Sequence, residues 1–438
     1  MVGPQPGAIT TGRVMHHFNY RGGKLHAENV GLEAIAAEVG TPVYVYSAAT
    51  IERHYRAYAG AFTGLEARVF YAMKANSNLA VLKLLGNLGA GADTVSEGEI
   101  RKALAAGIPA DRIVLSGVGK TEEELAFAVT EGIYQINVET EGELLALSRV
   151  AAGLGQRPAA VIRINPDVGA GGHAKITTGS SDNKFGVSIE EAERLYAVAA
   201  NLPGLRIEGL AMHIGSQIRA ISDFGAAFGR MRALVVRLRG QGHRVARVDL
   251  GGGLGIPYEM SEAVVHGPDL IQSYAALVRN TFQALDVEIG LEPGRIIVGN
   301  AGVLLSRVVQ LNKRQQKTFV VVDAAMNDLV RPAMYDAFHD IWPVRQAAPD
   351  DPRRDYDVVG PICETSDTFA EGRSLPDLQP GDLVAFMTAG AYGSAMSSTY
   401  NSRRLVPEVL VRDGDLAVVR PRQTWDELLG QDRVPGWL

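Results

Sequence analysis

Cysteine is almost absent from this sequence, and that absence excludes several classes of protein. The one cysteine among 438 residues, Cys363, cannot form a disulfide within the chain and suits a reducing compartment. No run of about 18 apolar residues occurs, so no membrane-spanning helix is expected. Residues 1–13 lack the apolar stretch of a signal peptide. These observations together predict a cytoplasmic protein that does not act at a membrane.

An excess of positive charge is also lacking. The net charge is −6, so nucleic acid is not an expected partner. Separately, the sequence predicts no metal site. Glycine, in contrast, is frequent at 49 of 438 residues, which indicates many tight turns or close backbone approaches. The length exceeds what one compact core usually holds, so we expect two domains.

Short apolar runs alternate with helix-like segments between about residue 65 and residue 295. Eight of these runs are candidate strands: 69–74, 90–95, 112–116, 133–138, 159–165, 207–214, 245–251 and 287–293. Several are apolar on both faces, as in a parallel sheet covered by helices. Four helix starts fit the capping box, at Ser96, Thr121, Thr140 and Ser188. The pattern favours a (β/α)₈ barrel, with a doubly wound sheet as the alternative.

After Arg295 the sequence pattern changes to β-rich segments separated by proline and glycine. Helical periodicity is scarce there, which predicts a mostly antiparallel β domain. Residues 17–29 look like a hairpin, and 42–47 look like another strand. We therefore predict a barrel over residues 48–296 and a β domain over 297–438, with residues 1–47 contributing strands to the β domain.

The stretch VFYAMKANSN, residues 69–78, places Lys74 where a buried strand ends. Catalytic groups of a barrel lie at the carboxyl ends of its strands, and a partly desolvated amine there could react with an aldehyde. A lone lysine at a strand end is more often one that extends to the surface, so the neighbouring motifs decide the interpretation.

Three further motifs follow strand ends. DLGGGLG, residues 249–255, supplies bare backbone that could bind an anion or simply turn, and Ile256 breaks the dinucleotide fingerprint. AMHIGSQ, residues 211–217, places His213 and Ser216, although a lone histidine is more often structural. LEPGR, residues 291–295, places Glu292 and Arg295, which could be a plain ion pair. Pyridoxal phosphate is one cofactor that would use all four features: a lysine, a phosphate cradle, a flat ring partner and an acid.

Six motifs occur in a fixed order: YAMKAN, HIGSQ, GGGLG, EPGR, GPICETSD and AGAYG. In that order they resemble the diaminopimelate decarboxylase family over roughly residues 15–425. That family has the fold-type III architecture of alanine racemase and ornithine decarboxylase, a TIM-like barrel followed by a β domain. The resemblance implies a pyridoxal-phosphate-dependent carboxy-lyase that converts meso-2,6-diaminopimelate to L-lysine and CO₂, the last step of lysine biosynthesis. It also implies a homodimer with shared active sites.

The resemblance implies roles for individual residues. The catalytic residues would be Lys74, His213, Glu292 and Cys363. Lys74 would form the Schiff base, and His213 would stack on the cofactor ring. Glu292 would bond to the pyridine nitrogen, and Cys363 would be the proton donor. The other cofactor-binding residues would be Arg163, Ser216, Gly252, Gly253, Gly294, Arg295 and Tyr392. The substrate-binding residues would be Arg295, Arg331, Tyr335, Glu364 and Tyr392. The segment 169–186 also matches the family, most firmly at Lys184, Phe185 and Gly186.

Three alternatives stay open. The first is a related decarboxylase acting on ornithine, arginine or carboxynorspermidine, which needs no clamp for a distal carboxylate. The second is an amino-acid racemase, which usually has an arginine where Glu292 stands. The third is a regulatory pseudoenzyme, which would be expected to lose Lys74 or Cys363, and both are present.

Overall fold

The computed structural model describes residues 16–168, 184–259 and 268–438, and the side chains of the last range from residue 270. The chain divides into two compact units. One unit holds Glu52–Ile256 and the segment that ends at Ile297. The other holds the segment that ends at Ile51, Val298–Leu438, and Pro257 with its neighbours.

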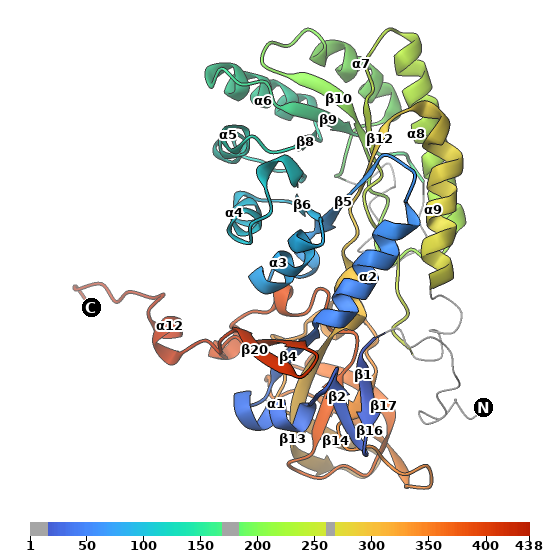
Figure 1. Cartoon of the computed structure of the whole chain (residues 1–438). Coiled ribbons are helices and arrows are strands. Elements are labelled where there is room, and N and C mark those ends of the chain that lie inside the picture. Colours follow the sequence, from blue (N-terminus) through green and yellow to red (C-terminus); the bar gives the residue numbers. More distant parts are fainter. Residues whose placement is uncertain (1–15, 169–183, 260–267) are drawn as a thin grey trace. The chain divides into compact units, whose positions relative to one another are not determined.

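The first unit is a closed barrel of eight parallel strands, which confirms the predicted fold class (Figure 1). The ring follows chain order from β5 to β12 and closes where β12 pairs with β5. The strands are β5 (Ala67–Ala72), β6 (Gly91–Thr94), β7 (Ile113–Leu115), β8 (Gln135–Val138), β9 (Ala159–Arg163), β10 (Arg206–Ala211), β11 (Arg247–Asp249) and β12 (Glu288–Leu291). All eight predicted strands are present, and the doubly wound alternative is wrong because both edges of the sheet are paired.

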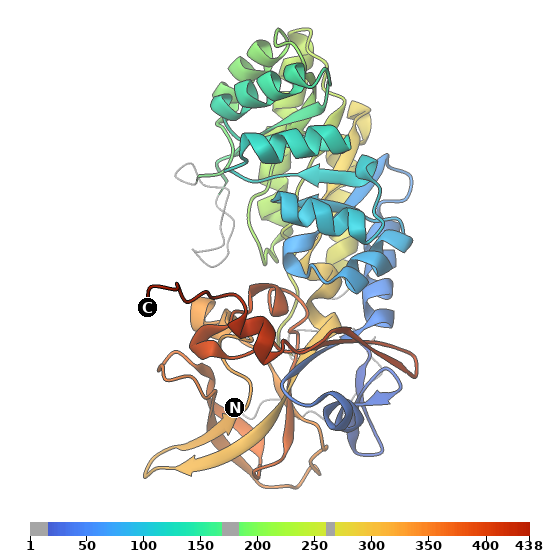
Figure 2. The ribbon, with the colours of Figure 1, turned by 90° about the vertical axis from the view of Figure 1, so that its left-hand side faces the viewer.

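Helices cover the barrel strands. Helices α3 to α6 pack side by side along one side of the barrel, and α8 packs against α9 (Figures 1 and 2). The helices whose bounds lie within or reach into this unit are α2 (Ala48–Ala61), α3 (Leu79–Asn87), α4 (Glu97–Ala105), α5 (Glu122–Glu131), α6 (Glu141–Gly153), α7 (Ile189–Ala199), α8 (Ile221–Gly240), α9 (Pro268–Phe282) and α10 (Arg295–Val298). In α8, Phe224, Phe228 and Met231 recur at helical spacing and are fully buried, which is why this segment is a helix with one apolar face.

The four predicted helix starts are confirmed. The side chains of Ser96, Thr121, Thr140 and Ser188 each accept a hydrogen bond from the backbone N–H three residues on. Such a cap typically stabilises a helix by about 1 kcal/mol. At Thr121 the third-position glutamate also bonds back to the cap, whereas Glu143 of α6 bonds instead to Lys120 and to the N–H of Glu139. Glu143 thereby belongs to a buried network around Glu139.

The amino ends of the barrel strands are joined by charge and aromatic contacts. The guanidinium groups of Arg68 and Arg247 both lie over the ring of Tyr134, 4.7 and 3.9 Å from its centroid. Glu288 pairs with both arginines. This end is thus occupied by paired charges and an aromatic ring, which is the pattern of a stabilising end rather than of a reactive one.

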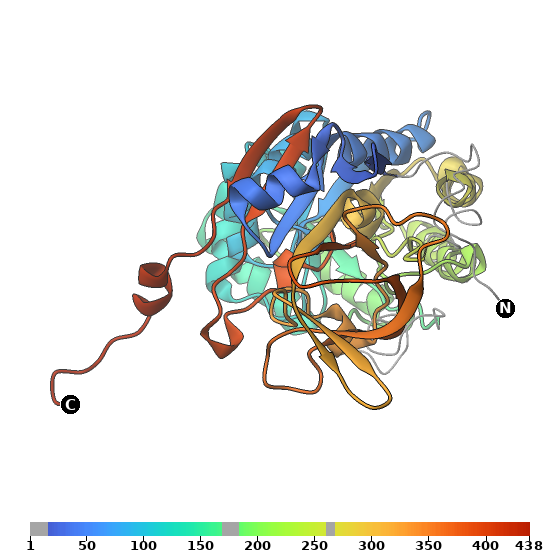
Figure 3. The same cartoon turned by 90° about the horizontal axis from the view of Figure 1, so that it is seen from below.

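The second unit is built on a mostly antiparallel sheet, as predicted. Its strand order is β17-β16-β14-β13-β4-β19-β20, and β18 pairs with β13 and β15. The strands are β4 (Val43–Ser47), β13 (Gly302–Lys313), β14 (Thr318–Val322), β15 (Ile341–Pro343), β16 (Arg353–Val359), β17 (Thr368–Pro376), β18 (Leu383–Phe386), β19 (Glu408–Arg412) and β20 (Asp415–Arg420). Strand β4 lies near the start of the chain, but it pairs with β13 and β19, which lie in its last third. Figure 3 shows these segments side by side.

The predicted hairpin at residues 17–29 is confirmed as β1 (Phe18–Arg21) and β2 (Lys24–Ala27), followed by β3 (Val30–Gly31). The helices of this unit are short: α1 (Leu32–Val39), α11 (Arg331–Tyr335) and α12 (Trp425–Leu429). Its core joins Phe18 and Leu25 of the hairpin to Val45, Val303 and Val409 of the sheet. Within the described ranges, none of the helices has both the length and the apolar character needed to cross a membrane.

Candidate active site

The predicted site residues of the barrel unit converge on one end of the barrel. Lys74 follows β5, Arg163 ends β9, and His213 and Ser216 follow β10. Gly252 and Gly253 follow β11, and Glu292, Gly294 and Arg295 follow β12. Because all eight strands are parallel, their carboxyl ends share one face of the barrel, where loops from different parts of the chain meet. One end therefore brings together a lysine, a histidine, a carboxyl group and a glycine-rich loop.

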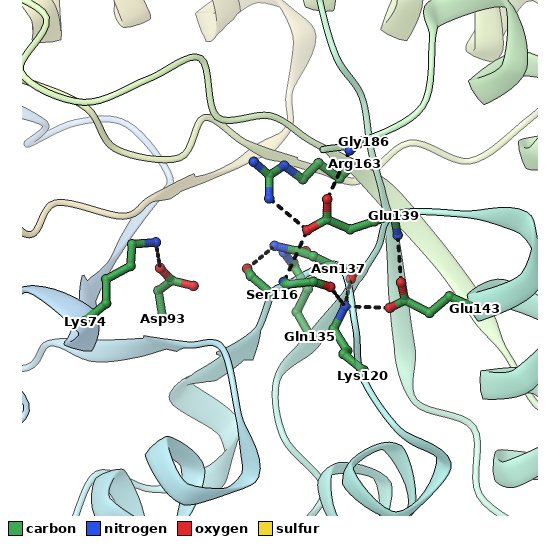
Figure 4. Close-up of polar contacts among 11 residues, drawn as sticks. Lys74, Asp93, Ser116, Lys120, Gln135, Asn137, Glu139, Glu143, Arg163 and Gly186 are labelled. Atoms are coloured by element: carbon green, nitrogen blue, oxygen red, sulfur yellow. Dashed lines mark hydrogen bonds and ion pairs between the residues drawn. The ribbon is translucent and has the colours of Figure 1, made fainter. Parts of the chain in front are cut away.

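Lys74 lies in a single 3₁₀ turn, Met73–Ala75, directly after β5. Its side chain is 38% exposed, while the flanking Met73 and Ala75 are buried. The ammonium group donates to Asp93 Oδ2 at 3.2 Å (Figure 4). Asp93 is 1% exposed, and its other oxygen, Oδ1, has no hydrogen-bond partner among the described residues. The amine is thus anchored by a buried carboxylate at a strand end and still accessible to a ligand.

The glycine-rich loop after β11 is shaped by close backbone contacts. A Cβ atom on Gly252 would lie 2.1 Å from the carbonyl oxygen of Glu292, and one on Gly253 would lie 2.4 Å from the carbonyl oxygen of Gly215. Gly253 also has a φ of +107°, a conformation that side chains rarely allow. Only glycine therefore lets the loops after β10, β11 and β12 approach one another at this end of the barrel.

His213 accepts a hydrogen bond at Nδ1 from the backbone N–H of Gly252, at 3.2 Å. Burial, and then the positive charges of Lys74 and Arg163, hold the pKa of His213 well below its usual value. A neutral, half-buried imidazole suits a flat partner for an aromatic ring. The Gly252 contact also fixes the tautomer, since Nδ1 is the acceptor.

Glu292 and Asp249 form a buried pair of carboxyl groups. Burial, and then the charges of Asp249 and Asp93, raise the pKa of Glu292 well above its usual value. Asp249 accepts from Gly251 N–H at 3.0 Å and from Gln135 Nε2 at 3.2 Å. Glu292 Oε1 has no hydrogen-bond partner among the described residues. A buried acceptor without a partner is costly, so this oxygen is suited to a protonated nitrogen of a ligand.

Two further predicted residues meet beside the glycine-rich loop. Arg295, 7% exposed, donates to the hydroxyl of Ser216 at 3.1 Å. Gly294 packs so tightly that an added Cβ would lie 3.1 Å from the Cβ atoms of Ala72 and Ala75. A guanidinium, a hydroxyl and bare backbone in one place are groups that bind phosphate oxygens.

The remaining predicted residues lie in the β unit. Arg331, at the start of α11, is 6% exposed, donates to His339 and stacks on Tyr258 at 4.6 Å. Tyr335 ends α11, and Tyr392 has a φ of +56° in a turn. Cys363 is exposed. The next residue, Glu364, accepts hydrogen bonds from Tyr400 at 2.7 Å and Ser366 at 2.9 Å. These two bonds, from Tyr400 first, lower the pKa of Glu364 and keep it ionised.

The structure adds site residues that the sequence reasoning missed. Asp93 is the last but one residue of β6, Asp249 ends β11, and Glu139, which binds Arg163, follows β8. Each is an acidic residue at the end of an apolar run, and that signal is visible in the sequence once the strands are drawn. Of the segment 169–186, residues 169–183 lie outside the described residues. Phe185, which is described, lies under the guanidinium of Arg163.

Fold and site together define a class: enzymes that bind pyridoxal phosphate on a parallel barrel joined to a β domain. The lysine, the neutral histidine, the unpartnered acid oxygen and the phosphate-binding groups fit that cofactor. In agreement, residues 48–299 match the family of pyridoxal-dependent decarboxylases through its pyridoxal-binding domain.

Whole-chain comparisons narrow the class. Diaminopimelate decarboxylase from Pseudomonas fluorescens is 50% identical over 96% of this chain and 100% of its own. The crystal structure of the Helicobacter pylori enzyme complexed with L-lysine is 39% identical, with a TM-score of 0.87 over 92% of this chain and 99% of its own. That of the M. jannaschii enzyme with L-lysine is 35% identical, with a TM-score of 0.90 over 96% and 98%. The chain belongs to the diaminopimelate decarboxylase family.

Proposed function

We propose that this protein decarboxylates meso-2,6-diaminopimelate to L-lysine and CO₂ with pyridoxal phosphate as cofactor. The observation that carries the proposal is the 50% identity to a diaminopimelate decarboxylase over nearly the whole of both chains. The reaction removes one α-carboxylate as CO₂ and adds one proton at the same carbon, so lysine is the product that balances. We further propose that the enzyme works in the cytoplasm in lysine biosynthesis.

When bound, pyridoxal phosphate supplies an aldehyde for amines and a ring that withdraws electrons from the bond that breaks. Lys74 would hold the aldehyde carbon and give it up to the substrate amine. Glu292 would keep a proton on the ring nitrogen through its unpartnered oxygen, and its buried position makes that interaction strong. His213 would cover one face of the ring, and Arg163 would contact the ring oxygen.

The phosphate would be held by the cluster beside the glycine-rich loop. The glycines support this role, because a loop without side chains lets an anion approach the backbone closely. The proposed phosphate-binding residues are Ser216, Gly252, Gly253, Gly294 and Arg295.

The substrate would be bound by charges of both signs. Arg295 and Arg331 offer cations for carboxylates, and Glu364 offers an anion for the distal amine. Tyr335 and Tyr392 would also bind substrate, and Cys363 would return the proton to the α-carbon. In this proposal the cofactor domain spans residues 48–296, and residues 1–47 and 297–438 form the β domain. The protein would act as a homodimer whose partner supplies Cys363 and Glu364.

A diamine-forming decarboxylase is the rival of the same fold. Ornithine and arginine carry no distal carboxylate, so they make no use of a second arginine in the substrate pocket. A solved lysine/ornithine decarboxylase from Vibrio vulnificus is 23% identical, which indicates a common fold and nothing more. The alternatives are therefore not favoured, and the substrate assay below separates them.

The test is CO₂ release from meso-diaminopimelate, L,L-diaminopimelate, ornithine, arginine and carboxynorspermidine. We expect turnover of the meso compound and little from the others. Borohydride reduction of the cofactor-bound protein should fix a pyridoxyl group on Lys74, with Lys74→Ala as the unlabelled control. Faster turnover of a diamine precursor would overturn the proposed substrate. A label on another lysine would overturn the site.

A further inference from the structure

Arg163 is held in place by a buried carboxylate. Glu139 follows β8, its side chain is fully buried, and its Oε1 accepts from Arg163 NH1 at 2.8 Å (Figure 4). The arginine side chain is itself only 9% exposed. A pair this well shielded from water interacts far more strongly than a surface ion pair, and removing one partner leaves an uncompensated buried charge.

The main chain fixes both oxygens of Glu139. Oε1 also accepts from Gly117 N–H at 3.2 Å, and Oε2 accepts from Gly186 N–H at 3.0 Å. A Cβ atom on Gly186 would lie 2.9 Å from the backbone of Ile164, and its φ is +70°, so glycine is needed there. The carboxylate therefore has a single orientation, set by loops that follow β7 and β9.

A second layer supports the first. Lys120, whose side chain is 2% exposed, donates to the carbonyl oxygens of Gly117 and Asn137 at 2.6 Å each and to Glu143 at 2.5 Å. Glu143 in turn accepts from the N–H of Glu139 at 3.2 Å. The loop ends after β7, β8 and β9 are thereby joined around Glu139, as Figure 4 shows.

The charge of Arg163 affects residues at the carboxyl ends of the barrel strands. Its guanidinium lies 4.9 Å from the ring centroid of Phe185, so one face of the group is packed as well. After burial and the charge of Lys74, the charge of Arg163 helps to lower the pKa of His213. At Glu292 it opposes the rise in pKa that burial and the neighbouring acids cause. A movement of Arg163 would therefore change the electrostatics of both residues.

We propose that Glu139 is a positioning residue that acts through Arg163: it orients the guanidinium toward the ring of bound pyridoxal phosphate. This inference rests on the proposed function, because it assumes that Arg163 contacts the cofactor. A residue with only a structural role would stabilise the barrel without a specific effect on the cofactor.

The test is a double-mutant cycle on cofactor affinity, measured by titrating the cofactor-free protein with pyridoxal phosphate in the absence of substrate. We expect Glu139→Gln to raise the dissociation constant about tenfold or more, in line with residues that orient metal ligands. In an Arg163→Met background the same change should cause no further weakening. The visible absorption band of the bound cofactor should also differ between Glu139→Gln and wild type.

Glu208→Gln is the matched control. Glu208 is 6% exposed and pairs with Arg206 and Arg244, but it lies in the first half of β10, away from the strand ends that carry the site. It should lower the thermal stability and leave the affinity and the visible band unchanged. If Glu139→Gln does not fold, Glu139→Asp replaces it; its shorter carboxylate should weaken cofactor binding less.

Two failures are distinguishable. If Glu139→Gln and Arg163→Met weaken binding additively, or if Glu139→Gln leaves the affinity and the visible band as in wild type, the positioning role is refuted while the proposed function stands. If wild-type protein binds no cofactor at Lys74 or releases no CO₂ from diaminopimelate, the proposed function itself fails.

Discussion

Replacing Asp249 by asparagine should have opposite effects on stability at acid and neutral pH in the cofactor-free protein. Asp249 is 2% exposed and bonded to Gly251 and Gln135, and it shares a hydrogen bond with Glu292. Burial first, and also the charge of Asp93, raise its pKa from 3.8 to about 6, against the lowering effect of its hydrogen bonds. Asparagine keeps the shape and removes the charge.

The magnitude follows from that shift. A pKa raised from 3.8 to about 6 means that the folded state loses about 3 kcal/mol relative to the unfolded chain as the pH rises from about 4 to about 7. The sign is that of a raised pKa. The contribution of Asp249 to the free energy of unfolding is fully present below the pKa of the unfolded chain, and it is lost as the pH rises through the pKa of the folded protein. Asparagine avoids this loss but leaves Gly251 or Gln135 without an acceptor, which costs about 1–2 kcal/mol. The variant should therefore be less stable at pH 4 and more stable by about 1–2 kcal/mol at pH 7.

Urea unfolding of the cofactor-free proteins at both pH values measures this difference. The three tryptophans, Trp342, Trp425 and Trp437, belong to the β unit, whereas most of the helix content belongs to the barrel. Far-ultraviolet circular dichroism thus follows mainly the barrel, and tryptophan fluorescence serves as the internal reference. An Asp249→Asn effect on the barrel transition that is the same at both pH values would refute the reasoning.

Three further predictions concern the site and the assembly. Glu292→Gln should bind pyridoxal phosphate but lower kcat, because a neutral amide stabilises a protonated ring nitrogen less well; a change within about twofold, or about 0.4 kcal/mol in barrier, contradicts its role. Gly252→Ala should weaken cofactor binding, since its Cβ would lie 2.1 Å from the Glu292 carbonyl oxygen; wild-type affinity in an equilibrium titration would argue against the tight loop packing. Mixing inactive Lys74→Ala and Cys363→Ala chains should restore about a quarter of wild-type activity if subunits exchange randomly and share sites; background activity despite proven exchange would rule out shared sites.

Much of the barrel was predictable because the signals are local. Each predicted strand is a short apolar run, and each confirmed cap depends on residues three positions apart, so neighbours in the chain suffice to identify them. The ends of the strands were predicted less accurately. Residues 207–214 were predicted as one strand, but β10 ends at Ala211, because His213 turns out of the sheet to meet the backbone of Gly252.

The sequence alone determined that Lys74, His213 and Glu292 follow strands that end at one face of a barrel, since strand order and parallel direction follow from the alternation of strands and helices. Only the tertiary structure decided which charges meet there. Glu139 pairs with Arg163, which is 24 residues further along the chain. The raised pKa of Glu292 depends in part on the charge of Asp249, which comes from the preceding strand. Burial and through-space distance set these interactions, and neither can be read from the order of residues along the chain.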